Sequence, residues 1–189
     1  MTRALAGGSV RIVGGRWRGT RLPVADAPGL RPTSDRARET LFNWLQTQLP
    51  GARVLDLFAG TGALGLEAVS RGAREAVLVE RDPALAAAIE ASVRRLDAGE
   101  AVRVVRADAL EFLRAPLMGR FDAVFLDPPF DAGLWAGALE RLPPWLADAA
   151  WLYLEAPAAG GPAPGPGWRL HREGRSREAR HALYRHEGA

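Results

Sequence analysis

Residues 54–65, Val-Leu-Asp-Leu-Phe-Ala-Gly-Thr-Gly-Ala-Leu-Gly, place an apolar run directly before a glycine-rich turn. The run is short and nearly continuous, which is typical of a strand buried on both faces of a parallel sheet. Glycines after such a strand let a ligand approach the backbone, and the N-terminus of the next helix lies beneath it. The stretch therefore predicts an α/β sheet with a ligand site at the carboxyl ends of its strands. A turn with a purely structural role is the alternative.

The glycines of this turn, Gly60, Gly62 and Gly65, match the G-x-G-x-x-G pattern of dinucleotide sites. Glu80 ends the next expected strand, 20 residues after Gly60, where an acid that binds a ribose belongs. The pattern alone fits a nicotinamide cofactor as well as another adenosine ligand. Asp56 favours the second kind, because a carboxylate repels a pyrophosphate and attracts an ammonium or sulfonium group. S-adenosylmethionine carries both cations and no phosphate, so we expect it as the cofactor.

A second motif, Asp127-Pro128-Pro129-Phe130, follows the apolar segment 121–126. Two prolines fix the backbone and remove two amide donors, so the local carbonyls are free to accept. The Asp127 side chain and the Pro128 carbonyl can together accept both protons of an exocyclic amine and aim its lone pair at an electrophile. Phe130 offers a ring on which a base can stack. The alternative is a rigid loop with Phe130 packed inward.

Outward from these motifs, strands and helices alternate, which predicts a parallel sheet covered on both faces. The expected strands are 53–57, 76–80, 102–105, 121–127 and a segment near 150–155, and the expected helices are 62–71, 83–97, 109–114 and 133–141. Asp108 precedes one of these helices, where its carboxylate can accept from an adenine amino group, cap the helix, or do both.

The flanking segments carry their own signals. We expect a β-hairpin over 10–24 and then a helix that Thr33 or Ser34 caps and that runs to about Gln48. Residues 156–167 contain only Ala, Gly and Pro and predict a surface loop. A final hairpin over 168–172 and 179–185 is expected to turn at Gly174.

The basic residues of the chain are all arginine: there are 25 among 189 residues, and the net charge is +3. Residues 1–50 hold eight of them against three acidic residues, whereas residues 51–150 hold eleven against fifteen. The basic N-terminal part indicates contact with a polyanion, while the preference for arginine over lysine fits coding bias. The chain has no cysteine, no run of about 18 apolar residues and no secretory pattern, so we expect a cytoplasmic protein without disulfides or membrane contact.

The basic charge is concentrated in residues 11–21, which contain no acidic residue and hold Arg11, Arg16, Trp17, Arg18 and Arg21. Guanidinium groups pair with phosphates and an indole stacks on bases, so this segment is a candidate for RNA contact. A solvated basic hairpin is the alternative. We expect no metal site, and surface positions for the three histidines, His171, His181 and His186.

Residues 56–62 and 127–130 together resemble the class I S-adenosylmethionine-dependent methyltransferases that act on exocyclic amines. Two N-terminal segments narrow the resemblance: RIVGGRWRG at 11–19 and LRPTSDRARETLFNWL at 30–45 are similar to the RsmD family. The last hairpin, at 172–175 and 182–184, also resembles that of the family. The match spans nearly the whole chain and departs visibly only in the loop at 156–167. This bacterial family methylates the N2 amine of one guanine in 16S ribosomal RNA.

The resemblance implies a Rossmann-like seven-stranded mixed sheet flanked by helices, with the last strand antiparallel. It also implies a small RNA-binding hairpin extension at 1–32 and a methyltransferase domain at 33–189. The catalytic residues that it implies are Asp127, Pro128, Pro129 and Phe130. The cofactor-binding residues that it implies are Thr33, Arg36, Glu39, Asp56, Phe58, Ala59, Gly60, Thr61, Gly62, Glu80, Arg81, Asp108 and Ala109.

Within that set, the resemblance gives Asp56, Gly60 and Gly62 to the methionine end of the cofactor. It gives Glu80 to the ribose hydroxyls and Asp108 to the adenine amine. Thr33, Arg36 and Glu39 would close over the pocket from the first helix.

The resulting hypothesis is an rRNA guanine-N2 methyltransferase that uses S-adenosylmethionine. We expect it to act as a monomer on 16S rRNA within an assembled or partly assembled 30S subunit. One alternative is an adenine-N6 methyltransferase on DNA or RNA, whose Asp-Pro-Pro-aromatic motif looks alike. The others are a nicotinamide-dependent oxidoreductase and a non-catalytic RNA-binding protein, and the complete motif at 127–130 argues against the last.

Overall fold

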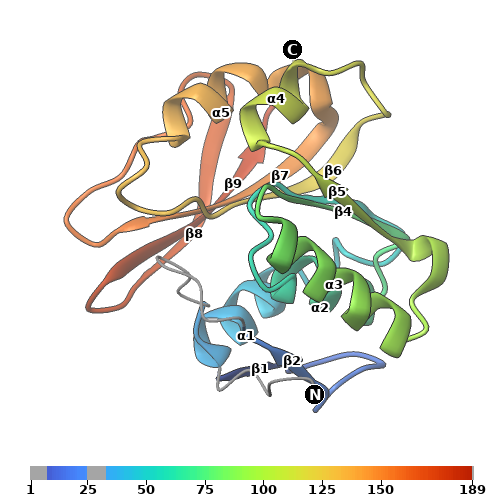
Figure 1. Cartoon of the computed structure of the whole chain (residues 1–189). Helices are drawn as coiled ribbons and strands as arrows, with labels where there is room; N and C mark the ends of the chain where they lie inside the picture. Colours follow the sequence, from blue (N-terminus) through green and yellow to red (C-terminus); the bar gives the residue numbers. More distant parts are fainter. Residues whose placement is uncertain (1–7, 25–32, 189) are drawn as a thin grey trace.

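The computed structural model describes residues 8–24 and 33–188, so residues 1–7 and 25–32 of the expected extension lie outside the described residues. In the described part, seven strands form one mixed sheet in the order β5-β4-β3-β6-β7-β9-β8 (Figure 1). Their bounds are β3 (Arg53–Asp56), β4 (Glu75–Glu80), β5 (Val102–Arg106), β6 (Phe121–Leu126), β7 (Leu146–Pro157), β8 (Trp168–Arg175) and β9 (Ala179–His186). Strands β3 to β7 run parallel and β9 runs antiparallel to both β7 and β8, which confirms the expected mixed sheet.

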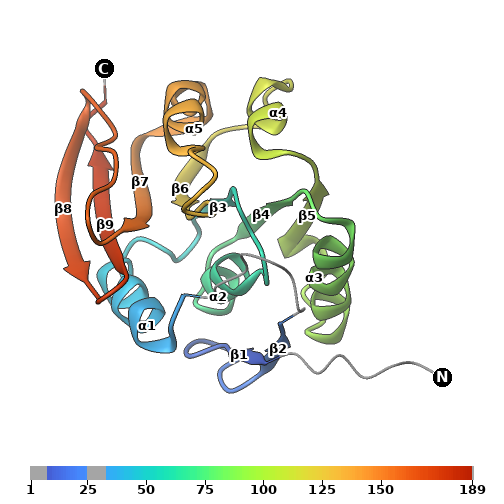
Figure 2. The same ribbon diagram turned by 60° about the vertical axis from the view of Figure 1, so that its left-hand side comes forward.

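Helices cover both faces of the sheet (Figure 2). Neighbouring residues of β3 point to opposite sides: Val54 is buried in one apolar cluster with Ile89, and Leu55 in a second with Trp135. The first cluster lies under three helices, α1 (Asp35–Trp44), α2 (Ala63–Ser70) and α3 (Pro83–Arg95), and the second under α4 (Ala109–Arg114) and α5 (Trp135–Arg141). Two short 3-10 helices span Gly99–Ala101 and Pro143–Trp145. No helix in residues 8–24 and 33–188 is long and apolar enough to cross a lipid bilayer.

The strand order reverses at β3, because the next strand, β4, lies on one side of it and the later strand β6 lies on the other. Such a switch point opens a crevice at the carboxyl ends of the strands, where open α/β sheets bind ligands. Asp56 is the last residue of β3 and pairs with Leu78 of β4 and Phe125 of β6. The topology therefore brings the residues after β3, β4 and β6 to one edge of the sheet.

The expected N-terminal hairpin forms from β1 (Ser9–Arg11) and β2 (Arg21–Pro23). Its residues Ile12 and Leu22 are fully buried in the cluster under α1, α2 and α3. The turn at Gly15 lies against the C-terminal end of α2: the Arg16 amide donates to the Ser70 carbonyl at 2.8 Å. Gly15 has φ +77°, and a Cβ there would lie 1.9 Å from that carbonyl oxygen. This close approach requires glycine.

Helix α1 starts at a Ser34 cap, whose hydroxyl accepts from the Ala37 amide at 3.2 Å. The helix ends at Trp44, earlier than the expected Gln48. The following turns are tighter, with hydrogen bonds between residues three positions apart, such as that from the Gln48 amide to the Leu45 carbonyl. Arg38 of this helix is buried and donates to the Glu67 carboxylate at 2.8 Å. The ion pair ties α1 to α2.

The last hairpin forms, but Gly174 is not at its turn. Gly174 lies inside β8 opposite His181, and the chain turns at 176–178 instead. Ser176 stabilises this turn, since its hydroxyl accepts from the amides of Glu178 and Ala179 at 3.3 and 3.0 Å. The preceding β7 also begins earlier than expected, at Leu146, and runs to Pro157, so the connecting loop begins at residue 158.

Candidate active site

The glycine-rich turn after β3 is held by two acidic side chains. The Asp56 carboxylate accepts from the Gly65 amide at 2.9 Å, inside the first turn of α2. The Glu80 carboxylate, at the end of β4, accepts from the Gly60 amide at 2.8 Å. Gly60 and Gly62 both have positive φ, +55° and +76°, so the chain turns here through a conformation that favours glycine.

Asp56 is almost completely buried, with 1% of its surface exposed. Burial raises the pKa of its carboxyl group to about 7, the Gly65 amide opposes this shift, and the charge of Glu80 adds to it. Among the described residues, no arginine or histidine forms an ion pair with Asp56. A buried acid with that environment suits a cationic ligand, because a neighbouring positive charge would restore its ionised form.

Glu80 and Asp108 both bind backbone amides. The second oxygen of Glu80 accepts from the Asp82 amide at 2.8 Å. Asp108 caps α4: its Oδ1 atom accepts from Leu110 and Glu111 at 2.9 and 3.2 Å. The helix-cap role of Asp108 is thus confirmed, while Oδ2 forms no hydrogen bond within the described part of the chain. The role toward an adenine amine stays a prediction for that atom.

The remaining residues predicted to bind the cofactor differ in position. Three lie in the turn: Ala59 is buried, and Phe58 and Thr61 are half-buried. Ala109 is the buried first residue of α4. Arg81 is exposed after β4. Arg36 and Glu39 are exposed on α1, and no hydrogen bond within the described residues joins them to Asp56 or Asp127. Their closing role stays a prediction.

The motif after β6 turns away from the sheet immediately beyond Leu126. Asp127 is half-buried, Pro128 is buried and Pro129 is exposed. The Phe130 ring is half-buried and lies with its centroid 6.0 Å from that of Trp135, tilted by 36°. The ring therefore packs on the protein on one side and still has accessible surface. This arrangement is intermediate between a ring free to stack on a base and a ring packed inward.

Asp127 belongs to a row of polar groups of which the sequence otherwise indicated only Thr33, as a residue closing over the cofactor pocket. The Thr33 hydroxyl lies 3.2 Å from Asp127 Oδ2 and 3.1 Å from Glu155 Oε2. The same Glu155 oxygen accepts from the Tyr153 hydroxyl at 2.9 Å. That hydroxyl lies 2.9 Å from His181 Nδ1. The one signal in the sequence for the rest of the row was Glu155 itself, an acid in the apolar strand WLYLEAP at 151–157.

The surface position expected for His181 is wrong. Its register opposite Glu155 places the ring beside Tyr153, and only 13% of the side chain is exposed. His171 is exposed as expected, and His186 is half-buried. The cause lies in strand pairing, because β9 places every second residue against the face that α1 covers.

Burial raises the pKa of the Asp127 carboxyl well above its ordinary value, and the nearby Glu155 and Asp56 charges add to the shift. The Thr33 hydroxyl opposes it by donating to the carboxylate. The pKa of Tyr153 is also raised by burial and by the two neighbouring acids, Glu155 and Asp127. The row is therefore short of positive charge, as is the Asp56 site beside it.

The residues predicted to contact RNA lie around the N-terminal hairpin. Arg16 and Arg18 are exposed, and the Arg16 guanidinium covers the Trp17 ring at 4.2 Å from its centroid. Arg11 is exposed and pairs with Asp35 at 3.2 Å, and Arg21 is exposed on β2. Trp17 is half-buried against the core, so it does not present a free indole. The Arg16–Arg18 turn lies at the far end of α2 from Gly62.

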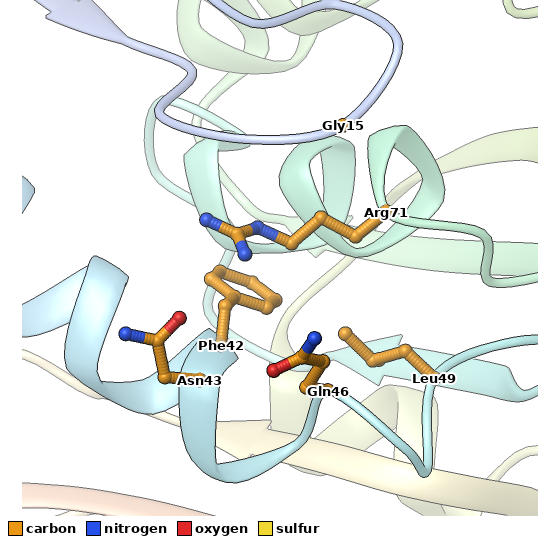
Figure 3. Close-up of a pocket in the computed structure, with 6 residues that line it drawn as sticks. All are labelled: Gly15, Phe42, Asn43, Gln46, Leu49 and Arg71. Atoms are coloured by element: carbon orange, nitrogen blue, oxygen red, sulfur yellow. The ribbon is translucent and has the colours of Figure 1, made fainter.

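A pocket of about 260 Å³ lies beside this turn (Figure 3). It is lined by Gly15, Phe42, Asn43, Gln46, Leu49 and Arg71. Figure 3 shows the Arg71 side chain extended over Phe42. The guanidinium carbon of Arg71 lies 5.1 Å from the centroid of the Phe42 ring. Phe42 is fully buried, so the pocket offers no open aromatic face, and none of the residues predicted for catalysis lines it.

The chain is similar in sequence and in fold to known proteins. A family model described as conserved hypothetical protein 95 matches residues 10–185. Ribosomal RNA small subunit methyltransferase D of Escherichia coli (strain K12) is 47% identical over 183 residues, which cover 95% of this chain and 91% of that protein. The protein of the same name from Haemophilus influenzae is 43% identical over 154 residues, 79% of this chain and 80% of that protein. The solved structure of yhhF from Escherichia coli gives a TM-score of 0.86 at 43% identity, covering 95% of this chain and 99% of that chain.

Proposed function

The chain belongs to the ribosomal RNA small subunit methyltransferase D family, and on this premise we propose that it methylates the exocyclic N2 amine of a guanine in 16S rRNA. The observation that carries the proposal is the meeting of two motifs at one edge of the sheet. Asp56 is the last residue of β3, and the turn with Gly60 comes after it. Asp127 directly follows the neighbouring strand β6. Their position on neighbouring strands supports the proposal of a cofactor site beside an amine acceptor.

We propose S-adenosylmethionine as the methyl donor, and the residues present fit it. Asp56 is buried without a cationic partner among the described residues, which suits the ammonium and sulfonium groups. Glu80 and Asp108 keep carboxylate lone pairs that suit the ribose hydroxyls and the adenine amine. A pyrophosphate beside Asp56 would be repelled, so this acid disfavours a nicotinamide cofactor.

The side chains do the positioning. Asp127 and the Pro128 carbonyl would accept the two N–H groups of the target amine and turn its lone pair toward the methyl group. Phe130 would support the base by stacking, which contributes about 1–3 kcal/mol per base in nucleic-acid sites. The bound cofactor supplies a methyl group that is activated by its sulfonium. Orientation and proximity then provide most of the acceleration.

RNA would be held by the basic side chains around the N-terminal hairpin, Arg11, Arg16, Arg18 and Arg21, with Trp17 fixing the turn. The target base must leave its stack to enter the crevice, which costs a few kcal/mol. A base that the assembling 30S subunit already presents unstacked avoids this cost. We therefore propose the assembled or partly assembled 30S subunit as the substrate, and a monomer as the acting form.

The test is mass-spectrometric mapping of 16S rRNA, naked and within 30S subunits, after incubation with the protein and labelled S-adenosylmethionine. One new N2-methylguanine is the expected product. N6-methyladenine would replace the proposed target with adenine. Calorimetric binding of NAD without binding of S-adenosylmethionine would overturn the cofactor and the reaction together.

Asp127→Asn provides the matched test of the amine site. The amide replaces one of the two carboxylate oxygens with an N–H donor and removes the negative charge that strengthens the contact with the amine, so we expect transfer to fall by about 10²-fold or more. Cofactor affinity, measured by calorimetry, should stay near the wild-type value because Asp56 and Glu80 are intact. Transfer at the wild-type rate would contradict the role of Asp127.

A further inference from the structure

Glu155 has no part in the function proposed for the two motifs, although it is the only charged residue in 151–157 and is buried with 7% of its surface exposed. It lies on β7, the neighbour of β6, on the face that α1 covers. Thr33 stands between Glu155 and Asp127, and its hydroxyl contacts both carboxylates at 3.1 and 3.2 Å. The structure thus links the proposed amine acceptor to a second, deeper acid.

The number of protons in this link is fixed by chemistry. A hydroxyl has one proton to donate, so Thr33 can donate to only one of the two carboxylates. The other contact is a hydrogen bond only if that carboxyl group is protonated and donates to the Thr33 oxygen. If both acids were ionised, one carboxylate oxygen would face the Thr33 oxygen in a buried place with no proton between them, which is costly. Three oxygens and two contacts therefore call for one proton beyond that of Thr33.

That extra proton has two places that satisfy both contacts. It can lie on Asp127, with Thr33 donating to Glu155, or on Glu155, with Thr33 donating to Asp127. A shift of both protons along the row converts one arrangement into the other without moving a heavy atom. Glu155 is equipped for the ionised form as well, because the Tyr153 hydroxyl donates to the same oxygen at 2.9 Å.

The surrounding groups favour such sharing. Asp56 on β3 adds negative charge beside Asp127, and Tyr153 on β7 is held neutral by burial and by the two acids. His181 on β9 lies with Nδ1 3.4 Å from Glu155 Oε2. Arg38 on α1 donates to the backbone carbonyl of Thr33 at 3.3 Å, and its ion pairs are with Glu67 and Asp35 rather than with Asp127 or Glu155. Two acids thus lie close together with little compensating charge, a situation in which one of them keeps a proton.

We propose that Asp127 and Glu155 share a single proton through the Thr33 hydroxyl, and that Glu155 takes this proton when the target amine needs Asp127 as an acceptor. Glu155 is then a positioning residue: it contacts neither base nor cofactor and sets the charge of the group that does. Thr33 moves the proton between them. The inference rests on the proposed function, since it assigns the target amine to Asp127.

Two conservative variants test the sharing by opposite effects. Transfer to 30S subunits is measured from pH 5.5 to 8.5 with cofactor and subunits saturating, so that the acid limb of kcat reports the ionisation of the pair. Glu155→Gln removes the charge that opposes ionisation of Asp127, so its acid limb should move to lower pH, by on the order of one unit. Thr33→Val removes the donor that favours ionised Asp127, so its limb should move to higher pH by a similar amount.

Two controls separate this role from a structural one. Thr33→Ser keeps the hydroxyl and should keep the limb at the wild-type pH. Glu140→Gln alters an exposed acid on α5, whose side chain is 76% exposed, and should leave the whole profile unchanged. A role limited to packing would lower kcat in both core variants without moving the limbs apart. Limbs that stay in place, or that move in the same direction, overturn the proposal.

A second measurement does not depend on activity or on the variants folding. In the wild-type protein with ¹³C-labelled carboxyl groups, the Asp127 and Glu155 resonances should move together at common midpoints during a pH titration. Independent midpoints, with one resonance unmoved where the other titrates, overturn the proposal. If the wild type methylates no rRNA while the resonances still titrate together, the proposed function fails and the shared proton stands.

Discussion

Asp56 shows how one residue can prepare the protein for a charged ligand. It ends a buried strand, binds the Gly65 amide and lacks a cationic partner among the described residues, and burial raises its pKa to about 7. The free protein therefore holds this acid partly protonated at neutral pH. A cation placed beside it would bring the pKa back down, and part of the binding free energy would be used to release that proton.

This coupling predicts pH-dependent affinity for S-adenosylmethionine. Protonated Asp56 cannot attract the cofactor cations, so affinity should fall as pH drops below about 7, approaching tenfold per unit, and level off above it. Isothermal titration calorimetry from pH 5.5 to 8.5 in buffers of different ionisation enthalpy would show both the affinity and the protons released. Asp56→Asn should bind more weakly and lose this dependence, and a wild-type affinity independent of pH would contradict the assignment.

At the scale of elements, α1 is fixed by charge as well as by packing. Arg38 is buried on this helix and joins it to Glu67 of α2 at 2.8 Å and to the Arg11 carbonyl of the hairpin at 2.6 Å. It also donates to the Thr33 carbonyl at 3.3 Å, one residue before the Ser34 cap. The same arginine thus fixes both α1 and the backbone at Thr33, which precedes the helix cap.

Removing this arginine should be strongly destabilising, because Glu67 would keep a buried charge with less compensation. We expect Arg38→Met to lower the free energy of unfolding by about 3–5 kcal/mol, measured by urea denaturation at pH 8. Burial already raises the pKa of Glu67. Loss of Arg38 raises it further, so the folded variant takes up a proton more readily and the deficit should shrink as pH falls toward 5.

Arg36→Met on the same helix is the matched control. Arg36 is exposed, so the free energy of unfolding of this variant should stay within about 0.5 kcal/mol of the wild-type value. Equal losses in both variants would mean that the Arg38–Glu67 pair is not what holds α1 in place.

At the scale of the whole molecule, charge is divided between two regions. Residues 51–150, which form the sheet from β3 to β6 and carry Asp56, Glu80, Asp108 and Asp127, hold eleven arginines against fifteen acids. The hairpin segment 11–21 holds four arginines and no acid. Its turn rests on the C-terminal end of α2, eight residues and about 12 Å along the helix from the glycine-rich turn. Anchoring of RNA and binding of cofactor would therefore use separate surfaces.

The separation predicts that the two affinities respond independently. Arg16→Ala combined with Arg18→Ala should weaken binding of 16S rRNA and reduce the salt slope by about one for each phosphate that is no longer neutralised. Affinity for S-adenosylmethionine should stay close to wild type. A filter-binding salt series for RNA and calorimetry for the cofactor would measure the two effects.

A control with the same charge change is Arg114→Ala combined with Arg120→Ala, two exposed arginines outside the hairpin with 54% and 64% of their side chains accessible. Its salt slope should match that of the wild type. If both double variants weaken RNA binding equally, net charge rather than the hairpin accounts for the affinity.

Local sequence patterns were enough to predict the order and type of the elements, and with them the two motifs. Apolar runs such as 121–126 and the turn at Gly60 are local patterns, in which each residue's preference and its immediate neighbours specify the backbone. Alternation of strands and helices then placed Asp56 and Asp127 at the same edge, because parallel strands share their carboxyl ends. The resemblance to a known family supplied the remaining topology, including the antiparallel last strand.

The surroundings of those motifs depend on contacts between residues far apart in the chain. Thr33 meets Glu155 across 122 positions of the chain, and Arg38 meets Glu67 across 29, and no period in the sequence encodes such pairs. The largely covered place of the His181 side chain depends on strand register, which side-chain alternation does not reveal for a single strand. Burial then changes the chemistry, since the pKa values of Asp56 and Asp127 are raised mainly by removal from water, an effect that arises only when the chain packs.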